Sequence, residues 1–158
     1  MKDKKIILIR GSLGVGKSTI AKALAENINA EYLSLDKIVD DNNLNGEDGI
    51  PLENFLKSNE IIFKLINDSE NYFVIDGCYY YQEQIDDLQK RFGGKILIFS
   101  LVSDVKICIS RDSGREKVYG EDSARFVHMI TTKVKSGYEI DNSHLSVQEV
   151  VNIILKNI

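Results

Sequence analysis

The chain has 158 residues, which suits one hydrophobic core, and its composition is ordinary for a globular protein. A net charge of −4 gives no broad electrostatic attraction for nucleic acid, and no apolar run approaches the length of a membrane span. Cys78 and Cys108 lie in apolar surroundings and form no metal-binding spacing. We interpret them as reduced core residues of a cytoplasmic protein.

The first predicted elements enclose a glycine-rich loop. A β-branched apolar run predicts a strand over residues 5–10, and apolar residues at helical spacing predict a helix over residues 17–29. Between them the sequence reads G-x-x-x-x-G-K-S, the Walker A pattern, in the strand–loop–helix context that this motif requires. The predicted phosphate-binding residues are Gly11, Ser12, Leu13, Gly14, Val15, Gly16, Lys17, Ser18 and Thr19.

The chemistry of this loop favours ATP with Mg²⁺. Its glycines let successive N–H groups point inward, and the helix that follows adds unpaired amides and the positive end of its dipole. Lys17 would contact the β- and γ-phosphates, and the Ser18 hydroxyl would hold Mg²⁺. The alternative is a glycine-rich turn that binds nothing, but the flanking strand and helix favour the phosphate loop.

Strands and helices alternate along the rest of the chain, which we expect to form one domain over residues 1–158. Strands are predicted at residues 31–35, 72–75, 96–99 and 138–141, and helices at 52–66, 85–92, 104–110, 121–135 and 147–155. Residues 40–51 are polar, contain two glycines and the only proline, and read as a loop. This alternation predicts a parallel sheet covered on both faces, with ligands bound beyond the carboxyl ends of its strands.

Two aspartates follow predicted strands. Asp36 would accept a proton from an acceptor hydroxyl or orient it, although it would also serve as a helix N-cap. Asp76 ends an apolar strand in Walker B position and would bind Mg²⁺, although Asp-Gly is also a common turn pair. Spacing does not decide which of the two serves the metal and which serves the acceptor.

The chain resembles small P-loop kinases of the adenylate-kinase-like and shikimate- or gluconate-kinase-like group. It is most similar to the adenylylsulfate-kinase and chloramphenicol-phosphotransferase-like members. The resemblance covers nearly the whole chain and rests on residues 11–18, 35–36, 74–77 and 111–115. It implies a three-layer α/β P-loop fold with a five-stranded parallel sheet in the order 2-3-1-4-5, and transfer of the ATP γ-phosphoryl group.

The resemblance also suggests roles in a short lid at residues 111–121. In related kinases, arginines such as Arg111 and Arg115 stack on adenine or neutralise the transferring phosphoryl group; the alternative here is a solvated pair bound to Asp112 and Glu116. Residues 142–144 stand where relatives contact adenine, or form an ordinary loop before the last helix. Residues 34–51 lack the paired arginines expected of a nucleoside-monophosphate kinase, so the acceptor is not specified.

These features predict a small-molecule phosphotransferase with its acceptor between Asp36 and Tyr79. The tyrosines at residues 79–81 would stack on the acceptor or pack in the core, and His128 and His144 have no partners in any triad or metal spacing. A nucleotide-dependent regulatory ATPase and an RNA-end or tRNA kinase are alternatives, and the acidic net charge counts against the last. We expect a monomer or homodimer without membrane attachment.

Overall fold

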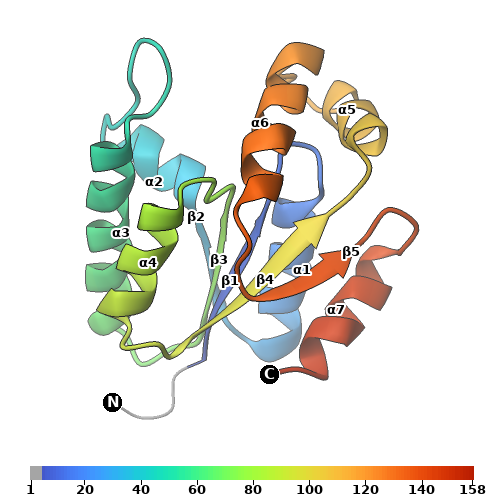
Figure 1. Ribbon diagram of the computed structural model, residues 1–158. Coiled ribbons are helices and arrows are strands. Elements are labelled where there is room, and N and C mark those ends of the chain that lie inside the picture. Colours follow the sequence, from blue (N-terminus) through green and yellow to red (C-terminus); the bar gives the residue numbers. More distant parts are fainter. Residues whose placement is uncertain (1–4) are drawn as a thin grey trace.

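Five parallel strands form one sheet in the order β2-β3-β1-β4-β5, as predicted (Figure 1). The computed structural model describes residues 5–158. The strands are β1 (Ile6–Gly11), β2 (Glu31–Ser34), β3 (Phe73–Gly77), β4 (Ile96–Val102) and β5 (Tyr138–Asp141). The helices are α1 (Lys17–Ile28), α2 (Leu35–Asp41), α3 (Leu52–Asn67), α4 (Gln82–Arg91), α5 (Val105–Ser113), α6 (Glu121–Lys133) and α7 (Val147–Leu155).

Alternating side chains of the sheet build two separate cores. On β1, Ile6 and Leu8 face a cluster with α2, α3 and α4, whereas Ile7 and Ile9 face a cluster with α1 and α7. Successive residues of a strand point to opposite faces, so a continuous apolar run of this kind is buried on both sides. The result is the predicted three-layer arrangement, in which α5 and α6 stand beyond the carboxyl ends of the strands (Figure 1).

Most predicted boundaries agree with the structure to within a few residues, and the region after β2 differs most. The second strand ends at Ser34 rather than at residue 35, because the Ser34 side chain caps α2 by accepting a hydrogen bond from the Lys37 N–H at 3.3 Å. The helix α2 then occupies the start of the segment that leads into the polar loop. Helix α7 begins with a capping box, in which Ser146 and Glu149 are bonded to each other's backbone N–H groups.

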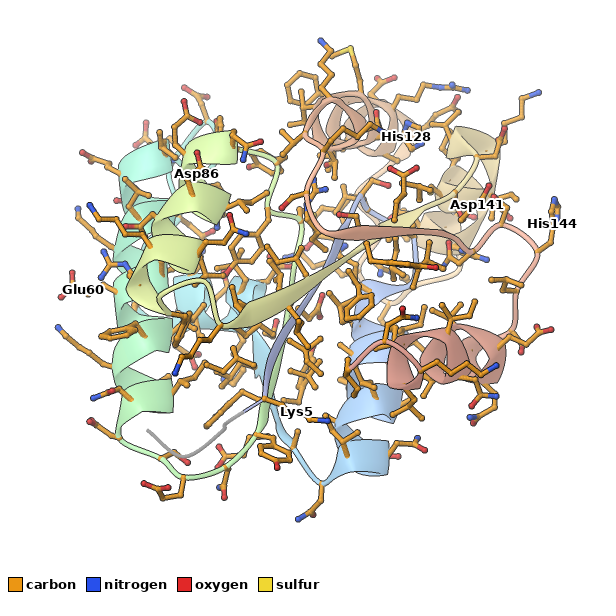
Figure 2. All side chains as sticks on the ribbon, turned by 60° about the horizontal axis from the view of Figure 1, so that its bottom comes forward. Lys5, Glu60, Asp86, His128, Asp141 and His144 are labelled. Atoms are coloured by element: carbon orange, nitrogen blue, oxygen red, sulfur yellow. The ribbon has the colours of Figure 1, made fainter. Side chains whose placement is uncertain are left out.

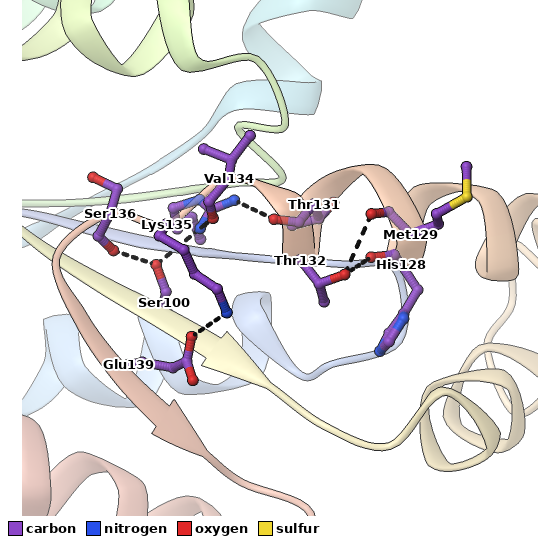
Figure 3. Close-up of polar contacts among 10 residues, drawn as sticks. Ser100, His128, Met129, Thr131, Thr132, Val134, Lys135, Ser136 and Glu139 are labelled. Atoms are coloured by element: carbon purple, nitrogen blue, oxygen red, sulfur yellow. Dashed lines mark hydrogen bonds and ion pairs between the residues drawn. The ribbon is translucent and has the colours of Figure 1, made fainter.

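A buried arginine fixes the end of α6 to the sheet. Arg10 is 2% exposed, and its guanidinium donates to the carbonyls of Thr131 and Val134 at 3.0 Å and to the Ser100 hydroxyl at 2.9 Å. The carbonyl end of a helix is the negative end of its dipole, which suits a cation. Burial nevertheless lowers the pKa of Arg10. Further polar contacts, including Ser100 to the Ser136 carbonyl, secure the same end of α6 (Figure 3).

No helix within residues 5–158 is both long and apolar enough to cross a membrane.

Both cysteines are free thiols, but only Cys108 is fully buried in a core. Cys78 is half-buried and lines a cavity beside the phosphate loop, so the prediction of a core position is correct for one cysteine and wrong for the other. Cys78 directly follows β3, and the carboxyl end of a parallel strand opens toward the ligand-binding edge of the sheet.

Candidate active site

The phosphate loop joins β1 to α1 at the carboxyl edge of the sheet. Gly14 and Gly16 adopt φ values of 74° and 100°, in the left-handed region that favours glycine. Gly16 caps α1 without any side-chain hydrogen bond. The first N–H groups of α1 are therefore left for a ligand, and a helix N-terminus with free amides is suited to an anion.

Lys17 is enclosed by the phosphate loop. Its side chain is 6% exposed, and its Nζ donates to the Ser12 carbonyl at 2.9 Å. Burial lowers the pKa of Lys17, but the neighbouring Cys78, Asp76 and Asp36 raise it by more, so the net shift is upward. The ammonium group is thus held as a fixed positive charge beside two carboxylates.

Helix α5 packs directly on the phosphate loop. A Cβ added to Gly14 would lie 2.1 Å from the carbonyl oxygen of Cys108, so a larger residue there would push α5 away. Arg111, near the end of α5, donates to the Val15 carbonyl at 3.1 Å and to the Asn142 carbonyl at 3.3 Å. Arg111 is therefore bonded to the phosphate loop in this structure. Residues 114–120, which follow α5, make no described hydrogen bond to that loop.

Asn142 closes the same junction from the other side. Its side-chain amide donates to the Val15 carbonyl at 2.7 Å, and its Oδ1 accepts from the Ser103 hydroxyl at 2.7 Å. Asn142 is 3% exposed, so it is a buried clamp at the carboxyl end of β5 rather than part of an exposed loop. The sequence singled out residues 142–144, and the structure brings the first of them to the loop.

Two cavities of similar size lie on either side of the phosphate loop. One, of about 300 Å³, is lined by Gly14, Val15, Gly16, Thr19, Arg111 and Arg115, among others. The other, of about 290 Å³, is lined by Leu13, Asp36, Asp40, Cys78, Tyr80 and Lys117, among others. The loop thus separates two sites, and each predicted catalytic side chain outside the loop lines one of them.

The carboxylate of Asp76 faces the start of α1. It is 4% exposed, and its Oδ2 accepts a hydrogen bond from the Tyr32 hydroxyl at 2.7 Å. The hydroxyls of Ser18 and Ser34 are close enough to oppose the rise in the pKa of Tyr32, so the phenol lies between the two predicted magnesium ligands. Burial, together with the charge and hydrogen bond of Asp76, raises the pKa of Tyr32, which keeps the phenol protonated as a donor.

These residues fit a magnesium ion that is carried mainly by nucleotide phosphates. In residues 5–158, no group of three or more His, Cys, Asp or Glu side chains could hold a metal. Mg²⁺ in nucleotide sites commonly takes only one or two protein oxygens and completes its shell with phosphates and water. Asp76 and Ser18 supply oxygens of that kind beside the phosphate loop.

Asp36 lies in the first turn of α2 and does not cap it, because Ser34 does. Desolvation of the carboxylate by the surrounding protein is the main cause that raises the pKa of Asp36, although the residue as a whole is exposed. The charges of Asp76 and Asp40 raise this pKa further, and Lys17 opposes them. A carboxylate with a raised pKa is a better proton acceptor for a hydroxyl group.

The loop between α5 and α6 is organised by a buried carboxylate. Asp112 is 1% exposed and accepts from the backbone N–H groups of Tyr119 and Gly120 at 3.1 Å. It also lies 4.0 Å from the guanidinium of Arg115, which is one contact of the expected alternative, a solvated pair of arginines bound to Asp112 and Glu116. Asp112 is buried, however, and Arg111 is bonded to the phosphate loop instead. Gly114 has an ordinary φ of −87°, so the glycine that needs a left-handed conformation in this loop is Gly120, with φ of 91°.

The three consecutive tyrosines separate into different environments. Tyr79 is 1% exposed in the core, and its hydroxyl donates to the Asn59 amide oxygen at 3.3 Å. It does not line the cavity beside Asp36, where we expected the acceptor to bind. A left-handed φ of 48° turns Tyr79 inward and leaves Tyr80 to line the cavity.

The two histidines lie apart from each other. A ring nitrogen of His128 is 2.9 Å from the Ser103 carbonyl, and Figure 2 shows His144 directed away from the molecule.

Sequence reasoning missed Tyr32 and the position of Cys78. Tyr32 looked like one residue of an alternating strand, and its only available signal was its place two residues before the end of β2. Burial raises the pKa of Cys78, although Lys17 opposes the shift, so the thiol stays protonated rather than acting as a nucleophile. Both residues owe their positions to strand pairing across the sheet, which no local pattern reports.

Comparisons with known proteins place this fold among the P-loop kinases, although no family model matches the chain. Curated relatives from Saccharolobus solfataricus and Saccharolobus islandicus, named "Putative adenylate kinase", are 28% identical over 159 residues, covering 95% of this chain and 81% of theirs. A gluconokinase structure from Sinorhizobium meliloti has a TM-score of 0.78 at 16% identity, covering 99% of this chain and 92% of that one. A shikimate kinase from Acinetobacter baumannii reaches 0.68 at 17% identity, covering 98% and 92%.

This chain has the P-loop kinase fold. The predicted five-stranded topology is confirmed, as is the resemblance to the adenylate-, gluconate- and shikimate-kinase group at the level of the fold.

Proposed function

We propose that this protein is an ATP-dependent phosphotransferase that moves the γ-phosphoryl group to a hydroxyl of a small-molecule acceptor. One observation carries the proposal: the phosphate loop separates two cavities of matching size, with Arg111 and Arg115 on one side and Asp36 on the other. A phosphoryl group held by the loop would face a nucleoside on the first side and an acceptor on the second. Phosphoryl transfer requires such an in-line arrangement.

The residues take the following roles in this proposal. Backbone amides of the loop and of α1 hold the phosphates, and Lys17 neutralises charge that develops on the transferring group. Arg111 forms a wall of the nucleoside cavity, where its hydrogen bond to the Val15 carbonyl already holds it. The lid expected over residues 111–121 is therefore limited to residues 114–120, which bring Arg115 to the phosphates when they close. Asp36 accepts the proton of the acceptor hydroxyl. Mg²⁺, held by Asp76 and Ser18 with the nucleotide, supplies charge neutralisation at the phosphates.

The named relatives make AMP the first alternative acceptor to consider. Recognition of a nucleoside monophosphate calls for cations, and arginine is the residue best suited to a phosphate. Among the described residues that line the acceptor-side cavity, Lys117 is the only cation, and two aspartates stand opposite. Adenylylsulfate is also an anion, so the same lack of cations counts against the adenylylsulfate-kinase-like members. We therefore propose a position near the chloramphenicol-phosphotransferase-like members rather than among nucleoside-monophosphate kinases.

The test is incubation with γ-labelled ATP, Mg²⁺ and a pooled extract of cell metabolites. Label on a small molecule is the expected result. Label only in free phosphate would instead support a regulatory ATPase, and label on RNA an RNA-end kinase. The Asp36→Asn variant is the matched control, because it should bind ATP normally and lose transfer.

We further propose that residues 1–158 act as one kinase domain in the cytoplasm, where ATP is abundant, as a monomer or homodimer. Size-exclusion chromatography with light scattering measures the assembly directly. A larger oligomer would contradict this part of the proposal.

A further inference from the structure

The acceptor-side cavity continues into a larger groove. The groove has a volume of about 570 Å³ and shares Ile50, Tyr80 and Val127 with the smaller cavity. The two cavities adjoin each other, because they share three wall residues, and we refer to the pair as the channel. The channel extends from Asp36 beside the phosphate loop to the space between the polar loop before α3 and helix α6.

The walls of the outer groove are apolar and aromatic. Tyr80 and Tyr81 form one side, with ring centroids 4.9 Å apart, and Phe55 meets Tyr80 edge-on at 5.5 Å. Opposite them, α6 presents Phe126 and Ile130, and Phe126 is 59% exposed. An apolar side chain left open to solvent beside a binding channel gains stability when a ligand covers it.

The charges of the channel are few and mostly acidic at its inner end. Asp36 and Asp40 on α2 face one exposed cation, Lys117, while the outer groove holds one charge of each sign, Asp48 and Lys133. No arginine is found among the described residues that line either part. A phosphate or carboxylate beside Asp36 would meet like charges, so the inner end favours a neutral or cationic group.

We propose that the acceptor is an elongated alcohol, neutral or cationic at its hydroxyl end, whose apolar body fills the groove between Tyr80, Tyr81 and α6. This inference rests on the proposed phosphotransfer. The hydroxyl oxygen forms a bond to the γ-phosphorus while the bond from that phosphorus to the bridging oxygen breaks. ADP leaves, the hydroxyl proton passes to Asp36, and the product is a phosphate monoester.

The test uses a series of probes with ATP and Mg²⁺. The alcohols are 2-phenylethanol, 4-phenylbutan-1-ol and 6-phenylhexan-1-ol, and the anionic probes are AMP, gluconate and shikimate. ADP release above the acceptor-free rate and the mass of the phosphorylated product are measured. We expect kcat/KM to rise at least about tenfold from the shortest to the longest alcohol, because each added methylene is buried.

Two neighbouring variants on α6 sharpen the test. Ile130 lines the groove, whereas Met129 is 47% exposed and does not line it. Ile130→Asp should remove most of the preference for the longest over the shortest alcohol, and Met129→Asp should keep it. Circular dichroism checks that both variants fold.

The outcomes separate this inference from the proposed function. Transfer to AMP, gluconate or shikimate in preference to every alcohol would leave phosphotransfer standing and overturn the elongated neutral acceptor. A kcat/KM that does not change with the chain length of the alcohol would also overturn the elongated acceptor and leave phosphotransfer standing. So would an Ile130→Asp variant with the same chain-length preference as Met129→Asp. Transfer to no probe and to no metabolite in the pooled extract would overturn the proposed function itself.

Discussion

The two cavities beside the phosphate loop are nearly equal in volume but are built differently. The nucleotide side is shaped by backbone groups and by side chains that are bonded to them, as Arg111 and Asn142 are to the Val15 carbonyl. The proposed acceptor side is shaped by side chains of α2, of the loop before α3, of residues 114–120 and of α6. A site formed by backbone groups changes little when side chains are substituted, so it suits a ligand that many enzymes have in common. A site formed by side chains can change its substrate without a change of fold.

The strongest test of the nucleotide side is Lys17→Ala. We expect turnover to fall about 10³-fold, because the variant loses a fixed charge that acts on the transferring phosphoryl group. The matched control is Lys37→Ala, since Lys37 is an exposed lysine on α2 paired with Asp41. Single-turnover transfer from γ-labelled ATP is the measurement. Near-normal transfer by Lys17→Ala would show that the loop does not act as a phosphate site.

The two lid arginines should divide between the two kinetic quantities. Arg115→Ala is expected to lower the transfer rate about 10³-fold with ATP affinity nearly unchanged, as for an arginine that acts in the transition state. Arg111→Ala should mainly weaken ATP binding, because Arg111 is already held at the nucleoside cavity. Titration of ATP affinity alongside single-turnover transfer separates the two effects. If both alanine variants match the parent in ATP affinity and in transfer rate, Arg111 and Arg115 have no role in nucleotide binding or transfer.

On the acceptor side, Asp36→Asn should lower turnover about 10²-fold through loss of the proton acceptor, with ATP affinity retained. Asp41→Asn is its control, because Asp41 lies on the same helix and faces solvent beside Lys37. Steady-state rates with saturating ATP provide the measurement. If both substitutions lower turnover equally, the loss arises from a change in α2 as a whole and not from removal of the Asp36 carboxylate.

Tyr32→Phe should raise the Mg²⁺ concentration for half-maximal activity about tenfold, because the variant removes the hydrogen bond that orients Asp76. The same substitution made in Asp76→Asn should have little further effect, since the carboxylate it orients is gone. Magnesium titrations of all three variants test this. Additive effects of the two substitutions would contradict a role for Tyr32 through Asp76.

The smallest expected effect is a change in pH dependence. In the proposed mechanism Asp36 acts as a base, so activity should fall when pH drops through the pKa of Asp36, which lies above its ordinary value. Asp40 contributes to that upward shift by charge repulsion. Asp40→Asn should therefore lower the pKa of Asp36 and move the acid limb of the kcat/KM profile to lower pH. An acid limb that stays in place would remove Asp36 as its origin.

The same contrast explains what the sequence could predict. The strands and the strand–loop–helix unit around residues 11–19 follow from local patterns, whereas the sheet order was implied by the resemblance to small P-loop kinases. The structure confirms the strands, this unit and the sheet order. The Asn142 clamp and the Tyr32–Asp76 bond join residues far apart in the chain, so they depend on strand pairing rather than on any local signal. The inward turn of Tyr79 depends on a left-handed backbone conformation, which alternation of side chains does not report.

The clamp that Arg10 makes on the end of α6 bears on the entropy of lid closure. The preceding helix α5 is pinned to the phosphate loop by Arg111 and by the close packing of Gly14, and α6 is pinned to β1 and β4 at its far end. Between these two anchors, residues 114–120 are the stretch outside any helix. Ordering a residue costs roughly 1–2 kcal/mol of conformational free energy, so ordering these seven residues would cost roughly 7–14 kcal/mol. The two anchors keep α5 and α6 out of that cost, so lid closure draws on binding free energy only for the stretch between them.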